Sequence, residues 1–429
     1  MQNKTVKFYT LGCKVNQYET QIIREQFQKA GYKEIEHGKH AYVCVINTCT
    51  VTHRADRDSL HFIRQERSRN KAAKIIVTGC LTEFDAAKII AAADVDLIVK
   101  NKDKNRIVQL LGNLTHDPRP TTHDPSSITS FKGRSRAFLK IQDGCNYHCS
   151  YCKVCLVRGK SRSLNLKDIK AEARALIENG YREIVLCGIC LGSYGKDLDP
   201  RIGLCEVINE LEMIDADFRI RLSSIELGDI SPGLIDKIAD CEKVCKHLHI
   251  PLQSGDEKIL KLMKRTYNPG QYVELVRKIR ASIPQVAITT DVIIGFPGET
   301  QDCFNNTVRL LEVIRPSRMH IFSYSKREGT PACSLQGSVS EDKIKLRVTE
   351  LNKIAKSLRL EYWQKFIQKT RGVLVESRFL GRNKMWQGYT DNYIRAVFSS
   401  NEDLSHRIIP VKLNKVECDF VLATKQRMY

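Results

Sequence analysis

Residues 137–152 read Ala-Phe-Leu-Lys-Ile-Gln-Asp-Gly-Cys-Asn-Tyr-His-Cys-Ser-Tyr-Cys, and this stretch decides the fold. Its first six residues predict a strand, and Cys145, Cys149 and Cys152 follow on a segment led by Gly. Three thiolates this close in sequence can hold one corner of a metal cluster, but a tetrahedral zinc site needs a fourth ligand. A cubane with three protein ligands keeps one iron open to a substrate or cofactor. The alternative is a zinc knuckle or a set of structural thiols.

Residues 131–369 are expected to form the domain that carries this segment. Helical patterns separate six strand candidates, at 137–142, 183–187, 219–223, 247–252, 287–294 and 319–324. This order predicts a partial (βα)6 barrel, whose functional groups should lie at the carboxyl ends of the strands.

Polar residues and glycines follow several of these strands. Gly188, Glu226 and Gln253 come after the second, third and fourth strands, and Asp291 lies within the fifth. Each can be explained singly as turn chemistry or as a satisfied core polar group. Together they predict a polar pocket that faces the Cys segment and suits a small zwitterionic cofactor.

Residues 1–113 alternate strand and helix patterns, which predicts a parallel sheet with helices on both faces. Cys13, Cys49 and Cys80 each follow a predicted strand. Parallel strands would deliver these thiolates to one edge and so build a second metal centre, which Gly12 and Gly79 would let the backbone approach closely. Three buried core cysteines are the alternative. Cys44, inside a strand, is interpreted as a core residue.

The remaining segments are a linker and a C-terminal module. Residues 114–130 are rich in Pro, Thr, His, Asp and Ser, which is typical of a linker. A helical pattern at 341–369 leads to residues 370–429, where short β-like runs predict a small β-barrel. The expected fold class is therefore α/β with a C-terminal β-barrel.

The composition is that of a soluble globular protein, and its charge favours an anionic partner. Among 429 residues, 69 Lys and Arg against 49 Asp and Glu give a net charge of +20, which indicates a polyanionic partner or a generally basic surface. No signal peptide or membrane-spanning stretch is evident, so the expected location is the cytoplasm. There, sixteen cysteines indicate metal binding or catalysis rather than disulfides.

The pattern CxxxCxxC after a first barrel strand resembles the radical S-adenosylmethionine superfamily. The three separated Cys before it and the small barrel after it resemble the methylthiotransferases, whose C-terminal RNA-binding barrel is called the TRAM domain. The string 11–19, Leu-Gly-Cys-Lys-Val-Asn-Gln-Tyr-Glu, resembles the branch that modifies N6-threonylcarbamoyladenosine in tRNA. The branches that act on isopentenyladenosine or on a ribosomal protein typically carry other residues after this Cys.

This resemblance implies two four-iron four-sulfur clusters and S-adenosylmethionine as cofactors. Cys145, Cys149 and Cys152 would hold the cluster that cleaves S-adenosylmethionine, giving a radical that takes hydrogen from C2 of the modified adenine at position 37. Cys13, Cys49 and Cys80 would hold the auxiliary cluster that presents sulfur. A second S-adenosylmethionine would supply the methyl group.

Further roles are implied for single residues. Tyr151 would pack beside the cofactor adenine, or else serve as a core aromatic. Cys155 and Cys190 depart from the family pattern, and each would be an inert thiol, an alternative ligand or a carrier of persulfide sulfur. Gly188, Glu226, Gln253 and Asp291 would line the cofactor pocket.

The implied partners are the anticodon loop of tRNA, an electron donor such as a flavodoxin or ferredoxin, and a sulfur source, with no membrane. Basic residues of the C-terminal module would track tRNA phosphates, namely Arg378, Arg382, Lys384, Lys412 and Lys425. Trp386, Tyr389 and Tyr393 would stack on bases or form the barrel core. A ribosomal-protein substrate fits the basic surface less well, and a non-enzymatic iron-sulfur RNA-binding or sensor protein would not explain the polar pocket.

Overall fold

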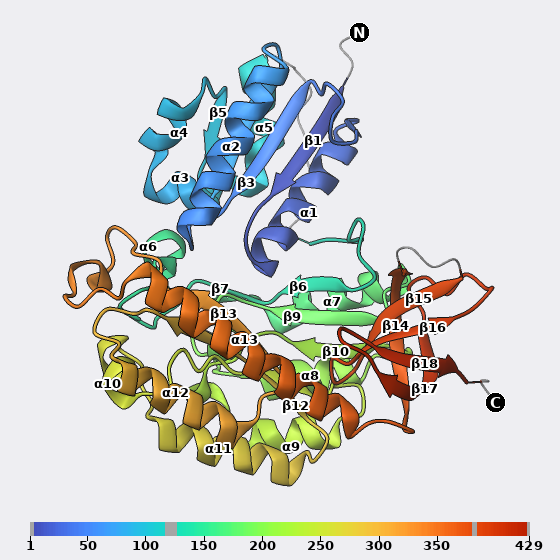
Figure 1. Ribbon diagram of the computed structural model, residues 1–429. Coiled ribbons are helices and arrows are strands. Elements are labelled where there is room, and N and C mark those ends of the chain that lie inside the picture. The colour runs from blue at the N-terminus through green and yellow to red at the C-terminus, as the bar shows by residue number, and fades with distance from the viewer. Residues whose placement is uncertain (1–3, 116–126, 380–383, 427–429) are drawn as a thin grey trace.

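The computed structural model describes residues 4–115, 127–379 and 384–426 (Figure 1). An N-terminal sheet with its helices lies above a central barrel, and a small C-terminal barrel lies at one end of the central one (Figure 1). Most of the expected linker, 114–130, falls outside the described residues.

The N-terminal sheet is entirely parallel, with the strand order β2-β1-β3-β4-β5. Its strands are β1 (Thr5–Thr10), β2 (Lys33–Glu34), β3 (Val43–Thr48), β4 (Lys74–Gly79) and β5 (Leu97–Val99). Its helices are α1 (Lys14–Lys29), α2 (His53–Arg69), α3 (Cys80–Phe84), α4 (Ala86–Ala92) and α5 (Ile107–Thr115).

Alternate residues of the N-terminal strands build two cores, one on each face of the sheet. Val43 and Val45 of β3 pack with α1 and α5, whereas Cys44 and Ile46 pack with α2 and α4. The interpretation of Cys44 as a core residue is thereby confirmed. The helical pattern of residues 83–92 by itself predicts one helix. Asp85 leaves helical geometry and caps α4 by accepting a hydrogen bond from the Lys88 amide, so two helices form.

The central barrel has six parallel strands in two three-stranded halves, which single bridges join. The strands are β6 (Ala137–Lys140), β9 (Glu183–Cys187), β10 (Arg219–Leu222), β11 (His247–His249), β12 (Ala287–Ile294) and β13 (Arg318–Ser323). The helices around them are α7 (Leu166–Glu178), α8 (Leu204–Glu212), α9 (Pro232–Asp240), α10 (Glu257–Leu262), α11 (Pro269–Ser282) and α12 (Gln301–Ile314). The predicted partial (βα)6 barrel is confirmed.

Two short elements lie near the Cys segment. β7 (Gln142–Asp143) pairs with β8 (Arg162–Ser163), and α6 (Val154–Arg158) lies between them in sequence. The fourth barrel strand is shorter than expected because Pro251 has no N–H for a ladder, and the Tyr267 hydroxyl donates to its carbonyl instead.

The C-terminal module is a closed barrel, as predicted, and its strand order is β14-β15-β16-β18-β17. Its strands are β14 (Thr370–Arg378), β15 (Met385–Thr390), β16 (Arg395–Ser399), β17 (Ile408–Val416) and β18 (Val421–Lys425). The long helix α13 (Glu341–Gln364) crosses the central barrel and ends at this module (Figure 1). Within the part of the chain that the structure describes, no helix has the length and apolarity that a bilayer crossing requires.

Candidate active site

The loop that carries Cys145, Cys149 and Cys152 is fixed at both ends. Gly144 has φ +74°, and a Cβ there would lie 2.0 Å from the Lys160 carbonyl oxygen, so only Gly fits. The Cys145 amide donates to the Gly159 carbonyl at 3.0 Å. Farther along, Ser150 bonds to the end of α10 through both its amide and its hydroxyl.

The three thiols of this loop suit a cluster better than a zinc ion. All three are partly accessible, and among the described residues no three thiols lie within 4.8 Å of one another. A tetrahedral zinc ion with Zn–S bonds of about 2.3 Å would hold its thiolates about 3.8 Å apart. The three thiols are therefore spaced more widely than the ligands of one zinc ion, and the donor set is the one that iron-sulfur clusters take.

Neighbouring groups act on these thiols in different ways. A hydrogen bond from Cys190 lowers the pKa of Cys145 to about 7, whereas burial raises the pKa of Cys152 to about 12. Cys149 Sγ accepts a hydrogen bond from Arg265 Nη1 at 3.3 Å. Because it bonds to Cys145, Cys190 is a fourth thiol within the site. Cys155 is half-exposed on α6, and its thiol donates to the Cys152 carbonyl.

The second set of thiols lies at one edge of the N-terminal sheet. Cys49 and Cys80 directly follow the strands β3 and β4, and Cys13 comes three residues after the end of the adjacent strand β1. Their thiols are close enough for the charges of Cys13 and Cys80 to raise the pKa of Cys49, although burial is the larger cause. Because Cys13 is exposed, a purely buried core of three cysteines does not describe this group.

Two glycines make this arrangement possible. Gly12 has φ +94°, and a Cβ there would lie 2.8 Å from both Cβ and Sγ of Cys49. Gly79 has φ +104°, and its Cβ would lie 2.2 Å from the Thr48 carbonyl oxygen. The close backbone approach predicted for both glycines is present.

The two thiol-bearing edges face each other. Arg158, at the end of α6, is 5% exposed and donates to Asn16 and, at 2.7 Å, to Glu19 of α1. Arg327 of the central barrel donates to the carbonyl of Thr50 at 2.8 Å, directly after Cys49. Figure 1 shows α3 next to α6, where these parts meet.

The strand-end residues have different surroundings. A Cβ on Gly188 would lie 2.7 Å from Gln142 Oε1, so close packing explains why this position is a glycine. Glu226 forms an ion pair with Arg265 and through it adjoins Cys149. Gln253 has φ +64°, and its amide donates to the Asp291 carbonyl at 2.8 Å.

Tyr151 is half-buried and lies edge-on to Phe296, with ring centroids 6.4 Å apart. Its contacts are those of a core aromatic at the rim of the site. Arg265 carried no signal in the sequence, because it follows α10 as one of several neighbouring basic residues, among them Lys261 and Lys264. The cofactor-binding roles given to Tyr151, Gly188, Glu226, Gln253 and Asp291 stay predictions.

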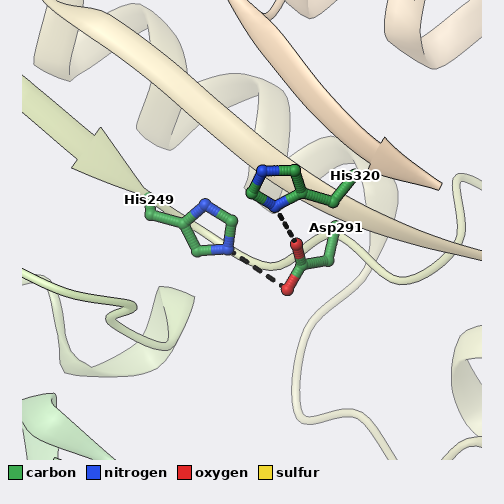
Figure 2. A group of neighbouring side chains, drawn as sticks. All are labelled: His249, Asp291 and His320. Carbon is green, nitrogen blue, oxygen red and sulfur yellow. Dashed lines mark hydrogen bonds and ion pairs between the residues drawn. The ribbon is translucent and has the colours of Figure 1, made fainter. Parts of the chain in front are cut away.

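Asp291 links two histidines inside the barrel (Figure 2). Its carboxylate lies 3.2 Å from His249 Nε2 and 3.0 Å from His320 Nδ1. Burial opposes ionisation, but hydrogen bonds from both imidazoles hold the pKa of Asp291 below its ordinary range. The sequence had no signal for this group, since its members come from three different strands.

The C-terminal aromatics are not open stacking platforms. Trp386 is 2% exposed, so the alternative of a barrel-core residue holds for it. Tyr389 and Tyr393 pack against the central barrel, where the guanidinium carbon of Arg221 lies 4.2 Å from the Tyr393 ring centroid. Arg382, expected to contact phosphate, lies outside the described residues.

Comparisons with known proteins agree with this geometry. The Radical SAM superfamily matches residues 139–311, and the uncharacterized protein family UPF0004 matches residues 5–100. The chain is 36% identical to the threonylcarbamoyladenosine tRNA methylthiotransferase MtaB of Bacillus subtilis, over 96% of this chain and 94% of the relative. It is 38% identical to the Thermotoga maritima protein of the same name, over 93% and 92%.

A second kind of relative is more distant. The tRNA-2-methylthio-N(6)-dimethylallyladenosine synthase of Clostridium tetani is 32% identical over 96% of this chain and 94% of the relative. Among solved structures, the radical S-adenosylmethionine methyltransferase TsrM of Kitasatospora setae has a TM-score of 0.57 at 11% identity, covering 77% of each chain. That likeness shows the fold alone.

A matching superfamily domain, a loop with the three thiols that an iron-sulfur cluster takes, and relatives matched over most of their length point to the same enzyme chemistry. The chain is an enzyme whose cofactors are four-iron four-sulfur clusters and S-adenosylmethionine. By its domains and by its full-length identity to the relatives above, the chain belongs to the family of radical S-adenosylmethionine methylthiotransferases.

Proposed function

We propose that this protein methylthiolates C2 of N6-threonylcarbamoyladenosine at position 37 of tRNA. The relatives with the higher identities carry this substrate in their names. The dimethylallyladenosine synthases cover a similar share of the chain at 32–33% identity. The net charge of +20 suits a tRNA partner and fits a basic ribosomal protein less well.

The observation that carries the proposal is the presence of two three-thiol edges that face each other from different domains. One lies on the loop after β6, and the other at the ends of β1, β3 and β4. A reaction that inserts sulfur at an unactivated carbon needs both a radical source and a sulfur source near one substrate atom. Two sites on opposing faces meet that need, whereas an iron-sulfur sensor would not need the second site.

Cys145, Cys149 and Cys152 would hold one cluster, and Cys13, Cys49 and Cys80 the other. When bound, the clusters and S-adenosylmethionine supply the one-electron, sulfur and methyl chemistry. The chain positions these thiols, through Gly12 and Gly144 for the backbone and Arg265 for the Cys149 sulfur.

The protein also joins its two halves rigidly at this junction. The guanidiniums of Arg158 and Arg327 are at most 5% exposed, and both pair with the N-terminal domain. Buried charged hydrogen bonds of this kind resist separation of the domains, because an unpaired buried charge is costly. They would keep a substrate placed between the two sites at a fixed distance from each.

The domain plan that goes with this proposal is an N-terminal methylthiotransferase domain at 1–113, a radical barrel at 131–369 and a TRAM-like barrel at 370–429. A flavodoxin or ferredoxin would supply electrons, and a separate donor would supply sulfur.

Single-Cys variants test the two sites. Reconstituted wild-type protein should hold about eight irons per chain. Cys149→Ala should abolish cleavage of S-adenosylmethionine, whereas Cys49→Ala should keep that cleavage and lose sulfur insertion. Cys205→Ala, on the remote helix α8, is the matched control and should behave like wild type. Sulfur insertion by Cys49→Ala would refute the role given to the N-terminal thiols.

Mass spectrometry of tRNA nucleosides tests the substrate. Cells that lack the gene should lose the methylthio form of threonylcarbamoyladenosine and regain it when the gene is restored. Loss of methylthiolated dimethylallyladenosine instead would assign the chain to the other branch, and an unchanged tRNA profile would refute a tRNA substrate.

A further inference from the structure

A small hollow lies where all three parts of the molecule meet. Its volume is about 70 Å³, and its lining includes Lys14 of the N-terminal domain, Ser223 and Arg318 of the central barrel, and Tyr393 of the C-terminal barrel. His247, His249 and His320 also line it. Lys14 directly follows Cys13, so the hollow adjoins the N-terminal thiol edge.

The hollow carries positive charge that the protein does not neutralise. The side chains of Lys14 and Arg318 both line the hollow, and among the described residues neither side chain has a hydrogen bond or an ion pair. Arg221, another lining residue, is paired with the buried Glu183 at 2.8 Å. The Asp291 carboxylate is bound by two imidazoles, as Figure 2 shows. Two free cations on one small hollow are an arrangement that binds an anion.

Two buried polar atoms of the lining also lack partners. Ser223 is 7% exposed and His247 is 4% exposed, yet Ser223 Oγ and His247 Nδ1 have no hydrogen bond in the part of the chain described. An unsatisfied buried polar atom is energetically unfavourable, so native proteins rarely keep one without a reason. A polar ligand in the hollow would supply the missing partners.

The hydrogen bonds of His247 and its neighbours determine whether His247 Nδ1 is a donor or an acceptor. Asp291 accepts from His249 Nε2–H, so a neutral His249 accepts from the Thr289 hydroxyl through Nδ1 at 2.8 Å. Thr289 then accepts from His247 Nε2–H at 2.9 Å. This chain leaves the lone pair of His247 Nδ1 as an acceptor. The hollow therefore offers an acceptor beside its two cations.

We propose that this hollow binds the threonyl part of an N6-threonylcarbamoyladenosine substrate, with its carboxylate on Lys14 and Arg318 and its hydroxyl between Ser223 and His247. The inference rests on the proposed function and names the residues that select the substrate. A dimethylallyl group has neither a charge nor a hydrogen-bonding atom. It would displace water from these groups without replacing the hydrogen bonds that they make to water. Polar sites reject analogues that lack a partner group in this way.

The test uses anticodon stem-loops that differ only at the N6 group of position 37. They carry threonylcarbamoyladenosine, its carboxylate methyl ester, or dimethylallyladenosine. Fluorescence anisotropy measures their binding to the protein, and mass spectrometry measures methylthiolation by the reconstituted enzyme. Wild type should bind the free carboxylate about tenfold or more tightly than the ester, since a charged hydrogen bond contributes about that much.

Arg318→Gln and Lys14→Gln should each reduce this preference to about threefold or less. Arg277→Gln, an exposed arginine on the outer face of α11, is the matched control and should keep the full preference. Equal discrimination by Arg318→Gln, Lys14→Gln and wild type would overturn the assignment of the hollow. So would a stoichiometric divalent metal other than iron that is lost in Asp291→Asn, because the hollow would then be a cation site.

The outcomes separate the two proposals. If wild type methylthiolates only the dimethylallyl stem-loop, the proposed function and this inference both fail. If wild type acts on the threonylcarbamoyl stem-loop but binds the ester equally well, only the assignment of the hollow fails.

Discussion

Replacing Gly12 by Ala should empty the N-terminal thiol site and leave the barrel site intact. At φ +94° an L-residue is strained by about 1–2 kcal/mol. The new Cβ would also lie 2.8 Å from Cys49 Cβ and Sγ, whereas carbon contacts normally begin at about 3.5 Å. Relieving that overlap costs about 1–3 kcal/mol, which gives about 2–5 kcal/mol together with the strain.

The cheapest relief is a shift of the Cys49 side chain, which displaces a ligand. Gly12→Ala should therefore hold about four irons per chain after anaerobic reconstitution, against about eight in wild type. Cleavage of S-adenosylmethionine should persist, and sulfur insertion should be lost.

Gly31→Ala is the matched control, because Gly31 has φ +79° in the same domain and its Cβ would meet nothing within 4 Å. This variant should lose about 1–2 kcal/mol of unfolding free energy and keep its iron. Iron content and sulfur insertion in Gly12→Ala equal to those of Gly31→Ala would refute the reasoning.

Three further predictions concern buried charges. Burial raises the pKa of Glu172 from 4.5 to about 7, so the folded state holds this proton more tightly and the unfolding free energy should fall as pH rises from about 5 to 8. Glu172→Gln should flatten that slope in urea titrations, and an unchanged slope would contradict this account. Arg265→Gln removes a cation 3.3 Å from the Cys149 sulfur, so the midpoint potential of the cluster there should fall by roughly tens of millivolts in an EPR titration. Glu183→Gln leaves three arginines without their shared carboxylate and should lower the unfolding free energy by about 3–5 kcal/mol. A loss under about 1 kcal/mol would show that these ion pairs do not stabilise the fold.

Local patterns were sufficient for the main strands of the two α/β parts of this chain. Alternation of strand and helix predicted the parallel N-terminal sheet and the six barrel strands, because period and turn chemistry are local properties. The boundaries that failed did so for local reasons as well. Asp85 divides a helix, and Pro251 ends a strand.

Side-chain partners between distant segments were beyond such patterns. Arg265 contacts Cys149, which lies 116 positions away along the chain, and no pattern near Arg265 in the sequence predicts that contact. Tyr389 and Tyr393 were expected to stack on bases or to form the barrel core, but the C-terminal barrel turns them against the central barrel. Exposure depends on the packing of whole domains, which no short window of sequence contains.

The sequence by itself determined the thiols, their spacing and the order of elements, since each of these follows from residue types a few positions apart. The tertiary structure alone decided that the two thiol edges face each other across Arg158. It also brought Lys14 and Arg318 to one hollow, although they are far apart along the chain. The physical reason is that parallel strands gather residues by sheet order and domain contact, and neither is encoded in the spacing of residues along the chain.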